Sequence, residues 1–270
     1  MRANVRYISF ANLIFLLLLI GAGSASGVTA EFLMLCAYVL PCALVFFFAR
    51  GCFKQPLEDL KLKKEGAFLT AVLIAPALAV IIGLFMLTAL IMEGAGVQVE
   101  RISTEPSFIY SLASLALVPA VLDELVFRYL PMKLLLPHSP RVCVLLSAAM
   151  FSAAHMSVQS FAYAFFAGVI FMTVNVISRS MLPSLIMHFM NNALSISLSY
   201  FGDALGFKIG FFVIFGLLLC CSLVVIALKR REIFLKIKGA FAKGNSGFFG
   251  LSPLAFLVPC VFIAIADLIG

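Results

Sequence analysis

The sequence predicts an all-α integral membrane protein, and three observations support that prediction. Hydrophobic residues make up 64% of the 270-residue chain, and the mean hydropathy is +1.17. Charged residues make up only 11%, whereas a soluble domain carries about a quarter. The apolar segments run without the alternating pattern that marks a membrane-spanning β-strand. A soluble globular domain and an outer-membrane barrel are therefore both excluded.

The apolar runs predict nine transmembrane helices, because a span needs roughly 20 apolar residues. The expected spans are 8–27, 32–49, 67–92, 107–135, 141–157, 160–178, 182–201, 209–228 and 247–269. Two further segments mix Leu, Ile and Phe with Lys and Arg, a composition typical of amphipathic helices at the membrane surface. These segments are 53–64 and 229–243. We divide the chain into N-terminal helices at 1–106, a central core of the fourth to seventh helices at 107–201, and C-terminal helices with a basic linker at 202–270.

The distribution of basic residues predicts the orientation. Lys and Arg gather before the first span and after the second, fourth, sixth and eighth spans, whereas the other loops carry mainly Glu and Asp. The N-terminus and the basic loops are therefore expected in the cytoplasm. The net charge of +7 follows from this bias and does not indicate nucleic-acid binding. Residues 1–27 also fit a cleaved signal peptide, an alternative that leaves the rest of the topology unchanged.

Three charged residues lie in the middle of the apolar segment 112–136. Glu124 and Arg128 are four residues apart, so on a helix they share a face and pair across one turn. Asp123 points about 100° away from Glu124. Burying an unpaired charge costs several kcal/mol, so we expect these groups to meet polar partners in a cavity between helices.

Two further helices each present a polar face at a similar depth. His155 follows Phe151 by four residues, and Asn192 follows His188 by the same interval. With a rise of about 1.5 Å per residue, these faces and the charged residues all fall at mid-bilayer. A lone Asn175 is expected to make a helix-packing hydrogen bond. We predict one site formed by the fourth, fifth and seventh helices, with the residues Asp123, Glu124, Arg128, His155, His188 and Asn192.

The order of these residues resembles a known family. The sequences D-E-L-V-F-R at 123–128, F-S-A-A-H at 151–155 and H-F-M-N-N at 188–192 are similar to the E-E-x-x-x-R, F-x-x-x-H and H-x-x-x-N/D motifs of the CPBP family. That family comprises the CAAX prenyl endopeptidases and their bacterial relatives, also called the Abi family. The resemblance covers about 107–200 and implies an eight-helix intramembrane protease, here with a ninth C-terminal helix. We expect the protein in a bacterial cytoplasmic membrane.

The resemblance also implies a role for each motif residue. Asp123 and His155 would hold and activate water, and His188 with Asn192 would stabilise the oxyanion. Glu124 with Arg128 would organise the site.

The family usually has Glu at the position of Asp123. Aspartate is one methylene shorter, and a misplacement of about 1 Å can cost on the order of 100-fold in rate. Three interpretations follow: the backbone compensates, Glu124 acts as the base, or the protein is not catalytic.

The expected partners are a membrane-associated peptide or protein substrate and the lipid bilayer, with no nucleic acid. We expect no cofactor, although Glu124, His155 and His188 would form a two-histidine, one-carboxylate zinc set. No H-E-x-x-H sequence supports that alternative. A proton-coupled transporter would use the same buried groups as a relay. A scaffold or immunity protein would bind a peptide without cleaving it.

Overall fold

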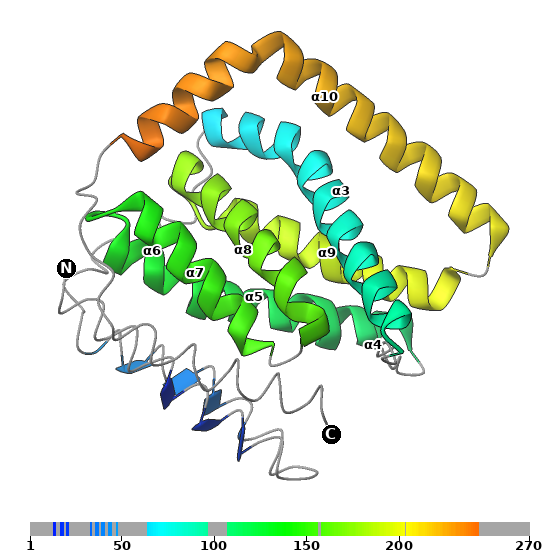
Figure 1. Ribbon diagram of the computed structural model, residues 1–270, viewed down its shortest axis with the longest axis horizontal. Helices are drawn as coiled ribbons and strands as arrows, with labels where there is room; N and C mark the ends of the chain where they lie inside the picture. The colour runs from blue at the N-terminus through cyan, green and yellow to red at the C-terminus, as the bar shows by residue number, and fades with distance from the viewer. Residues whose placement is uncertain are drawn as a thin grey trace.

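The computed structural model describes residues 64–96, 107–155, 158–202 and 204–242, together with scattered helical positions between 13 and 47. Every regular element in these ranges is a helix (Figure 1), so the predicted all-α class is confirmed. The spans predicted at 247–269 and, for the most part, at 8–27 and 32–49 lie outside the described residues. The surface segment predicted at 53–64 lies almost wholly outside them as well.

The third to eighth predicted spans each coincide with observed helical structure. The elements are α3 (Lys64–Gly94), α4 (Phe108–Ser111), the π-helix η3 (Leu112–Leu117), α5 (Val118–Glu124), the π-helix η4 (Leu125–Tyr129), α6 (Leu130–Leu135), α7 (Pro140–Ala154), α8 (Val158–Ser178), α9 (Leu182–Phe201) and α10 (Leu205–Phe241). Within the described residues, four helices are long and apolar enough to cross a membrane: Ala67–Gly94, Phe108–Leu135, Ser160–Ser178 and Leu205–Phe241. The protein is therefore an integral membrane protein.

The span Phe108–Leu135 is one helix interrupted by two π segments. Each π segment ends where a proline follows, Pro119 at the start of α5 and Pro131 at the start of α6. Proline has no N–H to donate and clashes with the carbonyl four residues earlier, which explains the wider turn before it. π turns are rare and occur often at functional sites. Their position on both sides of Glu124 therefore indicates that this helix carries a functional site.

Helix α8 lies at the centre of the bundle and packs against α3, α7 and α9 (Figure 1). Its contact with α7 is close because small residues line it. A Cβ added to Gly168 would lie 2.8 Å from the Ala148 Cα atom, and the Ser152 hydroxyl donates to the Phe161 carbonyl across the same interface. Such small residues let membrane helices approach backbone to backbone.

Helix α10 lies on the outside of the bundle and packs mainly on α3 (Figure 1). The sequence predicts a span that ends at residue 228, followed by a separate surface helix at 229–243. Helix α10 extends to Phe241, but its backbone is not helical at Lys229 (φ −104°, ψ 16°), where two helical segments meet at a kink. This kink coincides with the predicted boundary, and the Lys229 Nζ atom lies 4.6 Å from the centre of the Phe68 ring on α3.

The α7–α8 contact predicts a strong effect of one methyl group. Gly168→Ala should lower the thermal stability of the solubilised full chain, because forcing atoms into a packed contact costs about 1–3 kcal/mol. The matched control is Gly216→Ala in α10, where no atom lies within 4 Å of the added Cβ. Equal melting temperatures for the two variants would show that the close contact is absent.

Candidate active site

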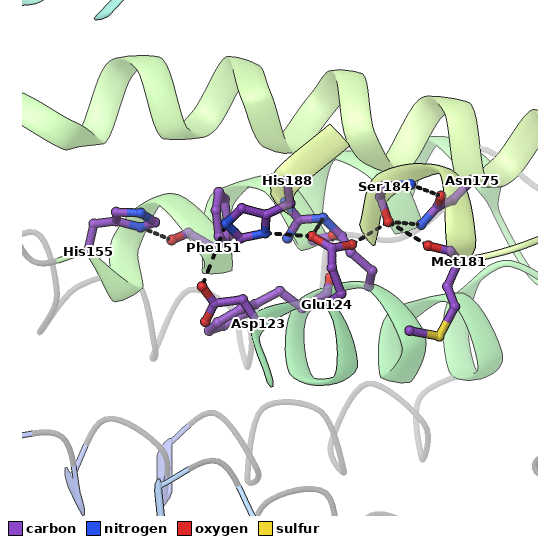
Figure 2. Close-up of polar contacts among 11 residues, drawn as sticks. Asp123, Glu124, Phe151, His155, Asn175, Met181, Ser184 and His188 are labelled. Carbon is purple, nitrogen blue, oxygen red and sulfur yellow. Dashed lines mark hydrogen bonds and ion pairs between the residues drawn. The ribbon is translucent and has the colours of Figure 1, made fainter. Parts of the chain in front are cut away.

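The centre of the site is the carboxylate of Glu124, the last residue of α5, which is fully buried. One oxygen, Oε1, accepts a hydrogen bond from His188 Nδ1 at 3.0 Å and lies 3.7 Å from Arg128 Nε. The other oxygen, Oε2, accepts from the Ser184 hydroxyl. Figure 2 shows Glu124 of α5 facing His188 and Ser184 of α9. A buried carboxylate is stable only with such partners, so these contacts hold α9 against α5.

Arg128 forms the predicted ion pair with Glu124 and is also fully buried. Its three guanidinium nitrogens have no hydrogen-bond partner among the described residues. Instead the guanidinium lies over the Phe151 ring, 4.2 Å from its centre, and 5.8 Å from the centre of Phe171. The charge is therefore stabilised by the nearby carboxylate and by the negative faces of two aromatic rings.

Asp123 approaches the opposite edge of His188. Its Oδ2 atom lies 4.0 Å from His188 Nε2, and its side chain is 14% exposed. Because Glu124 engages Nδ1 of the same ring, the two adjacent carboxylates flank one imidazole (Figure 2). The structure thus pairs a buried carboxylate with arginine and histidine and leaves the second carboxylate more accessible.

His155 joins this group through an aromatic neighbour. It follows the last residue of the short helix α7 and is exposed. Its Nδ1 lies 2.9 Å from the Phe151 carbonyl one helical turn earlier, so Nδ1 donates a hydrogen bond to that carbonyl. The Phe151 ring meets the imidazoles of His155 and His188 edge to face, at 4.7 and 5.4 Å between ring centres.

Asn192 is not brought into direct contact with the other predicted residues. It lies on α9 one turn beyond His188 and is half-buried. Its side chain has no hydrogen bond within the described part of the chain. Among the six predicted residues, direct contacts therefore join Asp123, Glu124, Arg128 and His188.

Two residues that the sequence analysis did not assign to the site take part in it. Ser184 donates to Glu124, and Asn175 on α8 donates to the Ser184 hydroxyl at 2.6 Å. Asn175 does make the inter-helix hydrogen bond expected of it, but its partner belongs to the charged cluster. The position of Ser184, four residues before His188, is the signal that identifies it, because residues at that interval share a helix face.

The alternative zinc set of Glu124, His155 and His188 is not assembled among the described residues. Both oxygens of Glu124 already accept hydrogen bonds, from His188 and Ser184. The described residues contain no group of three His, Cys, Asp or Glu side chains placed to hold a metal ion.

Comparison with known proteins identifies this region. Residues 105–194 match a family model described as type II CAAX prenyl endopeptidase Rce1-like. The match includes all three sequence motifs, so the resemblance to the CPBP and CAAX protease family is confirmed. No curated protein and no solved structure matches the chain.

The buried ion pair predicts a large stability loss when one partner is removed. Glu124→Gln should destabilise the protein by about 3–5 kcal/mol, because Arg128 then stays buried without its counter-charge. The control is Glu232→Gln, which breaks the exposed pair with Lys236 on α10 and should leave the melting temperature nearly unchanged. Thermal unfolding of both variants in the same detergent decides the point; a Glu124→Gln protein as stable as its control would contradict the buried pair.

Proposed function

We propose that this chain, whose residues 105–194 match the CAAX prenyl endopeptidase family, is an intramembrane endopeptidase. It would hydrolyse a peptide bond in a membrane-associated peptide or protein. The observation that supports this most is the imidazole of His188 held between two carboxylates in the middle of a membrane helix bundle. A hydrophobic leader or signalling peptide is the substrate class that we favour over a prenylated protein.

The geometry favours Asp123 over Glu124 as the group that takes a proton from water. Both oxygens of Glu124 are occupied, and its side chain is inaccessible. Asp123 is partly exposed, and its oxygen lies 4.0 Å from His188 Nε2. A single water can contact both atoms across a gap of this size. A carboxylate within hydrogen-bond reach of a bound water is a suitable general base.

The proposed reaction follows from these positions together with the family motifs. Water, held by Asp123 and His155, adds to the peptide carbonyl carbon while Asp123 takes its proton. The oxyanion accepts hydrogen bonds from a doubly protonated His188, through Nε2, and from the Asn192 amide. Asp123 then delivers its proton to the departing amine, and the C–N bond breaks to give a carboxylic acid and an amine. Each oxyanion donor is worth about 10²–10³ in rate.

Cleavage by the purified full chain in liposomes tests this function. Incubation with a library of hydrophobic fluorogenic peptides should give cleavage, with or without a chelator. His155→Ala and His188→Ala should each reduce the rate at least about 100-fold without affecting membrane insertion, which the apolar spans drive. His138→Ala, in the loop between α6 and α7, is the matched control and should retain activity. Full activity in His155→Ala would contradict the proposed role of His155 in holding water. No cleavage of any peptide would favour the scaffold interpretation.

The acidic pair gives a second test, because its two members should respond differently. Asp123→Glu should be tolerated or activating, since it restores the side-chain length that the family usually has. Asp123→Asn should lower the cleavage rate by about 10²–10⁴ because it removes the proton acceptor. If Asp123→Asn keeps substantial activity and Glu124→Gln abolishes it without unfolding the chain, Glu124 is the base and the assignment is wrong.

A further inference from the structure

We propose that Ser184 and Asn175 are positioning residues that hold the Glu124 carboxylate on His188 and away from Arg128. Neither residue belongs to the three family motifs. All three of Asn175, Ser184 and Glu124 are fully buried. The hydrogen-bond chain Asn175–Ser184–Glu124–His188 crosses from α8 through α9 to α5 and back to α9 (Figure 2).

Asn175 determines the direction of the Ser184 hydroxyl. Its Oδ1 accepts from the Ser184 backbone N–H at 3.1 Å, one of the free donors at the start of α9. The residue at the N-cap position, Met181, provides no side-chain cap. The Asn175 Nδ2 group donates to Ser184 Oγ at 2.6 Å. Since the hydroxyl already accepts from Asn175, its single hydrogen is available for Glu124; the Met181 carbonyl, 3.0 Å away, is the other acceptor within reach.

Ser184 opposes a competing interaction of the same carboxylate. Arg128 Nε lies 3.7 Å from Glu124 Oε1, and the guanidinium makes no hydrogen bond to the described residues. Arginine and carboxylate prefer two parallel hydrogen bonds at shorter distance. Without the Ser184 hydroxyl, Oε2 would be free to turn toward Arg128, and Oε1 would leave His188.

Loss of this contact would change the protonation of His188 at Nδ1. A carboxylate at Nδ1 fixes a proton on that nitrogen and orients the ring, which leaves Nε2 directed at Asp123. The value of this arrangement for catalysis rests on the proposed peptidase function. The proton on Nδ1 does not depend on that function, so it can be measured separately.

Solid-state NMR of ring-¹⁵N-labelled histidine measures the protonation of His188 Nδ1 directly in the full chain, reconstituted in lipid bilayers. The sequence has three histidines, and loss of a signal in His188→Gln assigns His188. Wild type should show Nδ1 of His188 fully protonated. In Ser184→Ala a part of the population should lose the Nδ1 proton and keep only the proton on Nε2. Ser184→Thr, which retains the hydroxyl, should restore the wild-type signal.

Two further variants keep the test decisive. Asn175→Leu removes the donor to Ser184 and should shift His188 in the same direction, which provides a second readout if Ser184→Ala does not fold. Ser147→Ala is the matched control, because it removes a buried hydroxyl that donates to the Phe127 carbonyl and should leave His188 unchanged. A folded Ser184→Ala or Asn175→Leu protein with the wild-type His188 signal would overturn the proposal, as would an equal shift in Ser147→Ala.

Peptide cleavage on the same proteins separates this inference from the proposed function. Ser184→Ala should cleave about 10–100-fold more slowly than wild type, the usual effect of losing a partner that orients a reactive group. Loss of the Nδ1 proton in the variant together with an inactive wild type would support the positioning role and contradict the peptidase. An active wild type together with an unchanged Nδ1 signal in the variant would support the peptidase and contradict the positioning role.

Discussion

The rest of the site depends on the burial of the Glu124 charge. A carboxylate removed from water must recover several kcal/mol from its surroundings, and here its partners come from its own helix and from α9. That requirement explains why His188, Ser184 and Arg128 gather at one point between two helices. It also explains the division between the two acidic residues, because the groups that stabilise Glu124 occupy both of its oxygens and leave Asp123 as the accessible carboxylate.

Local backbone geometry places this charge. Prolines at the start of α5 and α6 accompany the two π segments on either side of Glu124, and a π turn changes the face that the following residues present. The close α7–α8 contact at Gly168 and Ala148 brings Phe151 and Phe171 to the guanidinium of Arg128. Packing of apolar residues therefore provides the surroundings that a buried ion pair requires.

Much of this arrangement follows from the sequence, because apolar run length predicts spans and i,i+4 spacing predicts shared faces. The helices that carry His188 and the Glu124–Arg128 pair were predictable for that reason. Other features depend on three-dimensional contacts. Asn175 was expected only to pack, since nothing in its neighbourhood along the chain identifies Ser184 as its partner. The hydrogen bond of His155 to the Phe151 carbonyl likewise reflects local geometry that composition does not encode.

The central claim is that Glu124 and His188 interact directly in the buried site, and a double-mutant cycle on unfolding free energy tests it most directly. The variants are Glu124→Gln, His188→Gln and the double substitution, measured on the full chain in one detergent. Residues in contact show coupling of about 0.5–3 kcal/mol, and we predict a value in that range. The same cycle with His155→Gln, whose ring bonds to Phe151 instead, should be close to additive. Additive effects of Glu124→Gln and His188→Gln would contradict the account.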